Sequence, residues 1–508
     1  MVNLLALVRQ DFAGLAARAG LLRAPEPSPG LHTYEVEGGQ KTTRLHLRVQ
    51  RDGSALLFVD VTDVLHLTPS AAYMAWLALE KVPPNRAIPW MLARWHGVDR
   101  RRLTATYARI RRDIEALGRD DPSCRTCRLE LERMPLFSLP AGAPHKADLA
   151  LTYACNNACP HCYNDPGRFD LASLETDAWK RIIDRLAEVG VPHLIFTGGE
   201  ATLHPGLPEL VRHATGLGLV CGLNTNGRRL KHAEYTWSLY EAGLNHVQVT
   251  LHSHRPEVHD AMVAARSFEQ TVAGIRTALE TPLHVITNGT LTQANSGEIE
   301  ETLTFLHDLG ISTFALNGMI YSGGGDQNPD AIPQAALPPI LVRVKARAEA
   351  LGMRFLWYTV TEYCEMSPVE LELGAKRCNA GEYSICIEPN GDVLPCQSYY
   401  VSAGNLLRDP WEQIWNGQLF REFRERDADP RWAGLPEKCW TCPDLPLCGG
   451  GCRIERESRA GKAPGGCQSC ATGGVRSSGM PVARVCGGHT PAPENHDEIL
   501  VRLGGCSC

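Results

Sequence analysis

The chain has 508 residues, a length that suggests about three domains. Hydrophobic residues make up 44% and charged residues 21%, which is typical of a globular protein and excludes a disordered or collagen-like chain. No apolar run approaches the roughly 18 residues that cross a bilayer, and Arg9 and Asp11 end the first short run too early for a secretory signal. We therefore expect a cytoplasmic protein with no membrane partner. The net charge of -6 argues against wholesale binding of nucleic acid.

The first 120 residues show two patterns in succession. Between His32 and Leu67 apolar and polar residues alternate, with Asp52-Gly53 as a turn signal. Three helical stretches follow, at about 70–81, 87–96 and 101–117. A small antiparallel sheet followed by three short helices predicts a winged-helix-like domain at 1–120. The Pro- and Gly-containing stretch at 121–146 is the predicted linker.

Residues 147–351 follow a strand–helix rhythm. Six apolar strand candidates alternate with amphipathic helix candidates, a pattern typical of parallel βαβ repeats. The strand candidates lie at 147–153, 193–197, 220–225, 246–251, 283–287 and 311–316. Six units are too few for a closed eight-unit barrel. The predicted fold is therefore of the α/β class, an open partial (β/α)6 barrel.

Cysteine is unusually frequent, with 19 residues, of which thirteen lie between Cys364 and Cys508. In a reducing compartment such clusters are more often metal ligands than disulfides. We therefore expect the region 364–475 to be a Cys-rich domain held together by metal rather than by a large core. Residues 476–508 are predicted to be a Cys-containing tail.

The first cysteine motif follows the first predicted barrel strand and reads Cys155-x3-Cys159-x2-Cys162. A [4Fe–4S] cluster usually takes four cysteines, so three would leave one iron open to a substrate or cofactor. The carboxyl ends of barrel strands are also where active sites form. The alternatives are a zinc knuckle and a set of free thiols.

This motif resembles the CxxxCxxC motif of the radical S-adenosylmethionine (SAM) superfamily, whose fold is a partial (β/α)6 barrel. The resemblance spans about 147–351. The stretch Thr197-Gly198-Gly199-Glu200 is similar to the family motif that contacts the methionyl amino group, although Ala201-Thr202 follows where the family has proline. The resemblance implies a set of SAM-binding residues at strand ends: Gly198, Gly199, Glu200, Asn224, Thr225, Asn226 and Ser253.

The resemblance also implies a reaction. A reduced cluster passes one electron to the sulfonium, which splits into methionine and a 5′-deoxyadenosyl radical, and the radical abstracts hydrogen from a substrate. The implied cofactors are SAM and the [4Fe–4S] cluster that binds it. The implied electron donor is an external one-electron reductant of the flavodoxin or ferredoxin kind. The sequence identifies no catalytic acid or base.

A second cysteine constellation, Cys439-x2-Cys442-x5-Cys448-x3-Cys452, resembles the SPASM extension of these enzymes, which binds two auxiliary [4Fe–4S] clusters. The implied ligands of the first cluster are Cys378, Cys396 and Cys452, with Cys386 as a candidate fourth ligand; otherwise that cluster is open. The implied ligands of the second cluster are Cys439, Cys442, Cys448 and Cys467, with Cys470 as a substitute for Cys467. A zinc ribbon is the alternative, but Cys448 and Cys452 give it too many thiols for one zinc.

The remaining cysteines have simpler interpretations. No role is predicted for Cys364, Cys486, Cys506 and Cys508. The pair Cys124 and Cys127 is interpreted as unligated, and Cys221 as a small core residue.

The N-terminal pattern looks like the winged-helix peptide chaperone of pyrroloquinoline quinone biosynthesis, a domain type that recognises precursor peptides. The resemblance implies a precursor peptide as partner, bound along a sheet edge. The expected function is thus oxidative modification or crosslinking of a ribosomally made peptide.

Other functions compete with this one. Among enzymes, the substrate could instead be a tetrapyrrole side chain, or a protein side chain during enzyme maturation. From a different class, an iron–sulfur redox regulator would bind DNA, and residues 81–119 contain ten Lys or Arg but three Asp or Glu. A complete SAM-type site has no purpose in a sensor, so nucleic acid is not the expected partner.

Overall fold

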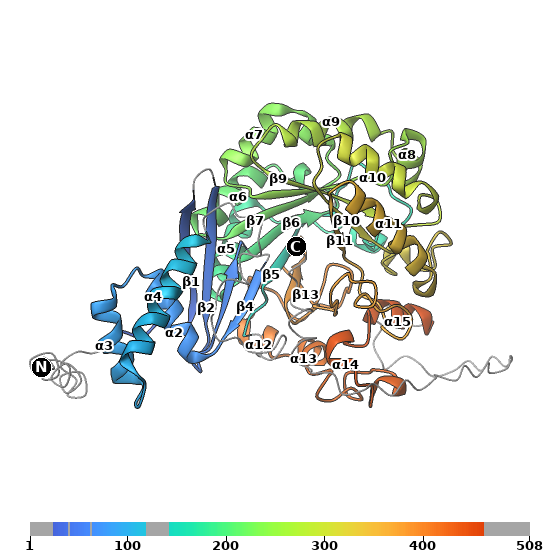
Figure 1. Ribbon diagram of the computed structural model, residues 1–508. Coiled ribbons are helices and arrows are strands. Elements are labelled where there is room, and N and C mark those ends of the chain that lie inside the picture. Colours follow the sequence, from blue (N-terminus) through green and yellow to red (C-terminus); the bar gives the residue numbers. More distant parts are fainter. Residues whose placement is uncertain (1–23, 39–40, 61–62, 118–141, 462–508) are drawn as a thin grey trace, which may run out of the picture.

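The computed structural model describes residues 24–38, 41–60, 63–117 and 142–461. Its N-terminal part, here called the N-terminal module (residues 24–117), is an antiparallel sheet followed by three helices (Figure 1). The strands, in spatial order, are β1 (Gly30–Gly38), β2 (Lys41–Val49), β3 (Ala55–Val59) and β4 (Asp63–Leu67). The helices are α2 (Pro69–Leu79), α3 (Pro84–Arg94) and α4 (Arg100–Ala116). The predicted order of sheet and then helices is confirmed.

Side chains of β2 explain why both faces of this sheet are covered. Leu45 and Leu47 are buried in the core that the sheet shares with the three helices. His46 and Arg48 point to the other face, because successive residues of a strand alternate. Thr68 caps α2 by accepting a hydrogen bond from the Ala71 amide at 3.4 Å, which marks the change from strand to helix.

The barrel contains the six predicted parallel strands. They are β5 (Lys146–Thr152), β6 (His193–Gly198), β7 (Val220–Thr225), β8 (His246–Thr250), β9 (His284–Thr290) and β10 (Thr313–Asn317). Helices cover their outer face (Figure 1). These helices are α5 (Thr176–Glu188), α6 (Leu207–Gly216), α7 (Ala233–Glu241), α8 (Pro256–Val263), α9 (Phe268–Leu279), α10 (Ile299–Asp308) and α11 (Pro338–Ala350).

The sheet is wider than six strands. β11 (Arg354–Trp357) extends one edge, and β12 (Ser384–Ile387) with β13 (Val393–Leu394) extends the other. β12 pairs in parallel with β5, Ser384 opposite Lys146 and Ile387 opposite Leu149. The Cys-rich region is therefore joined to the barrel by a continuous sheet, which the sequence pattern did not predict.

The remainder of the Cys-rich region consists of short helices and loops (Figure 1). Its helices are α12 (Trp411–Trp415), α13 (Gln418–Arg424), α14 (Leu445–Cys448) and α15 (Arg453–Arg459). The predicted tail at 476–508 lies outside the described residues, as does most of the predicted linker at 121–146.

The N-terminal module docks on the amino end of the barrel through β2. Arg48 donates to the carbonyls of Pro144 at 2.8 Å and Gly190 at 3.2 Å, and His46 Nε2 lies 2.9 Å from the carbonyl of Gly218. These carbonyls belong to the segments that lead into β5, β6 and β7. The module thus lies at the end of the barrel opposite to the carboxyl ends of the strands.

None of the helices in the described part of the chain has the length and apolar character that a membrane span requires.

Candidate active site

Cys155, Cys159 and Cys162 lie in the loop that follows β5, at the carboxyl edge of the barrel; we call residues 154–163 the cluster loop. One backbone hydrogen bond closes this loop on itself, and two others hold it to neighbouring segments. The Cys162 amide donates to Cys159 O at 3.1 Å, Ala158 donates to Val263 O at 3.0 Å, and Gly324 donates to Cys162 O at 2.7 Å. The sequence motif is therefore a fixed loop, whose shape is set by neighbours from α8 and from the segment after β10.

The three thiols are close enough to influence one another's ionisation. Burial, followed by the charges of Cys162 and Cys155, raises the pKa of Cys159 to about 12. Burial likewise raises the pKa of Cys162, and burial together with nearby negative charge raises that of Cys155. Thiolates are the form that binds metal, so this loop needs a strongly positive partner such as an iron–sulfur cluster. The donor set fits that group.

A single metal ion fits less well. Among the described residues, no three His, Cys, Asp or Glu side chains are arranged to hold one metal ion. Zinc draws its sulfur ligands to about 2.3 Å from one centre, whereas a [4Fe–4S] cube takes its cysteines at separate corners.

The glycines of the TGGE segment allow β6 to cross directly over the start of the cluster loop. Gly198 has φ +134°, and a Cβ on it would lie 2.1 Å from Thr152 O. A Cβ on Gly199 would lie 2.4 Å from Tyr153 O. The amides of Gly199 and Glu200 then bond to Thr152 O at 2.7 Å and Ala154 O at 2.9 Å. Only glycine permits this approach of two backbones.

Glu200 is buried beside the cluster loop and gathers polar groups from β7. Its Oε1 accepts from Thr225 Oγ1 at 2.7 Å, and its Oε2 accepts from the Asn226 amide at 2.7 Å. The Thr202 hydroxyl and amide also donate to Oε1, at 2.6 and 3.1 Å. Within the described residues Oε2 has one partner, so it keeps room for a further donor such as an ammonium.

Three other predicted cofactor residues differ in their surroundings. Asn226 Nδ2 donates to Asn156 Oδ1 of the cluster loop at 2.6 Å. Asn224 lies half-buried on β7, in the same strand as Thr225. Ser253 is buried, donates to Glu298 and accepts from the Arg255 amide at 2.9 Å. The structure thus brings Glu200, Thr225 and Asn226 together, and engages Ser253 with a carboxylate.

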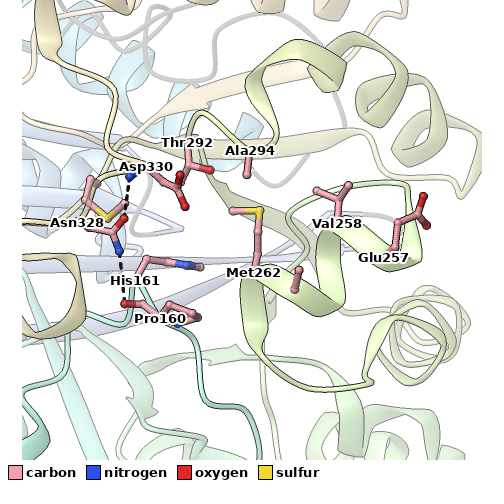
Figure 2. Close-up of a pocket in the computed structure, with 11 residues that line it drawn as sticks. Pro160, His161, Glu257, Val258, Met262, Thr292, Ala294, Asn328 and Asp330 are labelled. Atoms are coloured by element: carbon pink, nitrogen blue, oxygen red, sulfur yellow. Dashed lines mark hydrogen bonds between the residues drawn. The ribbon is translucent and has the colours of Figure 1, made fainter.

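A cavity of about 280 Å³ adjoins the cluster loop (Figure 2). Its walls come from the cluster loop, α8 and the segments after β9 and β10; lining residues include Pro160, His161, Val258, Met262, Thr292 and Asp330. Asn328 holds one wall in place by donating to Pro160 O at 3.4 Å and accepting from the Asp330 amide at 3.0 Å. The sequence did not predict this cavity, because its walls are far apart along the chain.

The cysteines assigned to the first auxiliary cluster converge in the structure. Cys378, Cys396 and Cys452 pack against the same small apolar cluster, which contains Tyr399 and Phe423. Burial raises the pKa of Cys452 to about 12, with Cys378 as the next cause. Burial and then Cys378 also raise the pKa of Cys396.

The second auxiliary group is described in part. The Cys442 amide donates to Cys439 O at 3.3 Å. Burial raises the pKa of Cys439, and nearby charges, that of Cys448 among them, also act on it. The Cys448 sulfur accepts from the Tyr363 amide at 3.5 Å. Several cysteines lie outside the described residues, namely Cys124, Cys127, Cys467, Cys470, Cys486, Cys506 and Cys508.

Two cysteines have unexpected surroundings. Cys386 is buried on β12 in an apolar cluster with Ala150, Tyr153 and Leu394. Cys364 is exposed, with Lys438 Nζ 3.4 Å from its sulfur. Cys221 is buried in the barrel core, as its position in a strand predicts.

Comparisons with known proteins agree with this geometry. The family description "Radical SAM superfamily" matches residues 149–317, and "Iron-sulfur cluster-binding domain" (SPASM) matches residues 378–443. The chain is similar to the PqqA peptide cyclase of Streptomyces rochei, with 30% identity over 69% of this chain and 96% of that protein. It is also similar to the AdoMet-dependent heme synthase of Methanosarcina barkeri, with 28% identity over 63% of this chain and 94% of the relative.

Two further matches concern proteins whose names refer to peptides or maturation. The mycofactocin maturase MftC of Mycobacterium tuberculosis is 32% identical over 59% of this chain and 76% of its own. The solved structure of Streptococcus suis SuiB bound to the precursor peptide SuiA covers 84% of this chain and 96% of its own, with 15% identity and a TM-score of 0.57. At that identity the likeness concerns the fold. The matched 84% of this chain is more than residues 142–461 make up, so the match includes residues outside that range.

Proposed function

Because the chain belongs to the radical SAM superfamily and carries its SPASM extension, we propose that it modifies a ribosomally made precursor peptide by radical chemistry. The observation that carries this proposal is the cluster loop. It presents three thiols at the carboxyl edge of the barrel, next to the Gly198–Glu200 segment. A reduced [4Fe–4S] cluster there would supply the electron that cleaves SAM to methionine and a 5′-deoxyadenosyl radical.

The residues of this chain have separate tasks in that reaction. Cys155, Cys159 and Cys162 would hold the cluster and leave one position open. Glu200 would accept the methionyl ammonium through its remaining lone pairs, since Thr202, Thr225 and Asn226 already fix its orientation. A fixed acceptor loses little entropy when the ligand binds.

The cavity beside Pro160 and His161 would take a further part of SAM or of the substrate (Figure 2). Burial lowers the pKa of His161, although the charge of Asp330 opposes that effect. Burial therefore favours the neutral imidazole, which can donate or accept a hydrogen bond without adding charge.

A peptide substrate is supported by the relatives and by the N-terminal module. Three of the matched proteins are named as a peptide cyclase, a maturase and a protein bound to a precursor peptide. The sheet of the module ends in β1 and β4, and edge strands offer backbone groups to which an extended peptide can add. A leader bound there would tether the peptide to the enzyme.

The position of the module sets a length requirement on such a peptide. The module docks at the amino end of the barrel, while the cluster loop lies at the carboxyl end. The barrel strands have five to seven residues, which at about 3.3 Å per residue is roughly 20 Å. A peptide that contacts both ends therefore needs a spacer of at least about six extended residues between leader and modified residue.

The two auxiliary clusters would accept an electron from the substrate radical, which makes the overall modification oxidative. Their ligands would be Cys378, Cys396 and Cys452 for one cluster, and Cys439, Cys442, Cys448 and Cys467 for the other. Loss of two hydrogens with formation of a C–C or C–S crosslink fits this role. An external one-electron reductant would complete the cycle.

A non-peptide substrate is the second candidate, because one relative is a heme synthase. The test is anaerobic incubation of the reduced enzyme and SAM with a precursor peptide encoded beside its gene. The proposal predicts a peptide lighter by two hydrogens and release of 5′-deoxyadenosine in step with it. Conversion of a tetrapyrrole, with the peptide unchanged, would favour the second candidate.

A binding experiment tests the alternative of a DNA-binding regulator. Affinities for the leader and for duplex DNA are compared at physiological salt. We expect tight leader binding, and weak DNA binding that falls steeply with salt, because the basic surplus of 81–119 acts on phosphates alone. Tight, sequence-selective DNA binding without leader affinity would contradict the proposal.

A further inference from the structure

A short basic turn borders the cluster loop. η3 (Arg228–Lys231) connects β7 to α7 and carries Arg228, Arg229 and Lys231 within four residues. Arg229 and Lys231 are exposed and Arg228 is partly exposed. Within the described part of the chain, none of the three forms a salt bridge with a carboxylate. Three cations are thus concentrated on one small surface of a chain whose net charge is -6.

Arg228 fixes this turn against the cluster loop. Its guanidinium donates to Asn156 O, to Asn157 Oδ1 at 2.9 Å and to Gln270 Oε1 at 3.0 Å. Asn156, whose carbonyl accepts from Arg228, is exposed at this place. The turn therefore lies beside the part of the cluster loop that a second protein could approach.

Arg229 and Lys231 are the two exposed cations of the turn. Arg229 donates to Thr202 O and lies over the Tyr235 ring, 4.3 Å from its centroid, which holds its charge in place. Charges held in place need no reorganisation when a partner docks, and surface charges of one sign steer an oppositely charged partner.

We propose that η3 is the docking surface for an acidic one-electron carrier protein. The inference rests on the proposed function, because it needs a redox cluster held by Cys155, Cys159 and Cys162. One electron passes from the reduced carrier to the cluster, so the carrier is oxidised by one electron and no atom is transferred. A cation surface beside the cluster loop attracts an acidic carrier and orients it next to that loop.

The test uses the full chain with reconstituted clusters and an acidic flavodoxin as the probe. The double variant Arg229→Glu/Lys231→Glu reverses two charges, and the single variant Lys231→Glu is the fallback if the double variant does not fold. Arg408→Glu is the matched control, because Arg408 is exposed and lies in the Cys-rich region. Binding of oxidised flavodoxin is measured at low and high salt, and cluster reduction by reduced flavodoxin and by dithionite is followed optically.

We expect the double variant to bind flavodoxin about tenfold more weakly at low salt, with a smaller loss at high salt. Reduction by flavodoxin should slow about as much, reduction by dithionite should be unchanged, and the control should match the wild type. Equal binding and equal reduction by flavodoxin in wild type and double variant would overturn the inference. Loss of duplex-DNA binding in the variant, with flavodoxin binding unchanged, would also overturn it. If dithionite-reduced wild type cleaves no SAM, the proposed function fails instead.

Discussion

Arg168 and Glu388 form a 2.9 Å ion pair between the segment that follows the cluster loop and the Cys-rich region. Glu388 has no exposed side-chain surface, and its other carboxylate oxygen accepts from Tyr153 OH at 3.0 Å. Arg168 also donates to Tyr400 O at 3.0 Å, and Tyr400 OH donates to Tyr163 O at 3.1 Å. Tyr163 directly follows Cys162, and Tyr400 lies four residues after Cys396. One polar network therefore connects the cluster loop with the cysteines of the Cys-rich region.

Removing Arg168 should destabilise the protein, because Glu388 would remain buried without its counterion. For Arg168→Met we expect a loss of about 2–3 kcal/mol in the free energy of unfolding, less than for a fully buried pair because Arg168 is 26% exposed. Chemical denaturation measures it. The control is Arg421→Met, whose pair with Glu425 is exposed, so its expected loss is much smaller. Equal losses in both variants would show that the Arg168 pair has no special role.

Gly199→Ala should disturb the start of the cluster loop. The new Cβ would lie 2.4 Å from Tyr153 O, so one of the two backbone segments must move, at a cost of about 3 kcal/mol. Gly216→Ala is the matched control, because nothing lies within 4 Å of its Cβ at the end of α6. The control should be neutral or more stable by up to about 1 kcal/mol. Denaturation of both variants measures the difference, and an unaffected Gly199→Ala protein would contradict the close approach.

Acid should loosen the contact between the N-terminal module and the barrel. Burial lowers the pKa of His66 and of His246 to about 4, and lowers those of His145 and His193 as well. These imidazoles bind fewer protons in the folded protein than in the unfolded chain. The free energy of unfolding is therefore at its full value above the unfolded pKa of about 6.5. It decreases as pH falls from there towards 4.

Thermal unfolding between pH 8 and pH 4 measures this dependence. The melting temperature should decline below about pH 6.5, and His66→Leu should flatten the decline, because one of the titrating groups is gone. A variant with the same pH profile as wild type would contradict the role given to His66.

The sequence predicts those features of the structure that depend on the residues of a single segment. The six barrel strands were placed by their apolar runs, and the cluster loop by the spacing of Cys155, Cys159 and Cys162. The TGGE segment was recognised too, although the reason for its glycines, contact with Thr152 O and Tyr153 O, appears only in the structure.

Features that depend on pairs of distant segments were missed. β12 has four residues, too few for a periodic pattern, and its place beside β5 depends on tertiary packing. Arg168 and Glu388 are 220 residues apart, and nothing in either local sequence indicates the other. The run Gly323-Gly324-Gly325 is a sequence signal for a close approach of two backbone segments. A Cβ on Gly323 would lie 2.4 Å from Asn164 O, beside the cluster loop.

Iron content tests the auxiliary sites. Anaerobically reconstituted wild type should hold three cubane clusters, about twelve irons per chain. Replacing Cys378, Cys396 and Cys452 together with Ala should remove about four. Cys386→Ala should keep all of them, because its thiol packs among Ala150, Tyr153 and Leu394. Iron loss in Cys386→Ala would make Cys386 the fourth ligand, and about four irons with tightly bound zinc in wild type would favour the zinc ribbon.

The most direct test of the account is reductive cleavage of SAM by the variant Cys155→Ala/Cys159→Ala/Cys162→Ala. Wild type and variant are reconstituted anaerobically, reduced with dithionite and given SAM without substrate, and 5′-deoxyadenosine is quantified alongside iron. The account predicts that wild type releases 5′-deoxyadenosine, whereas the variant releases none and retains about eight irons on its auxiliary cysteines. Release of 5′-deoxyadenosine by the triple variant at the wild-type rate would contradict it.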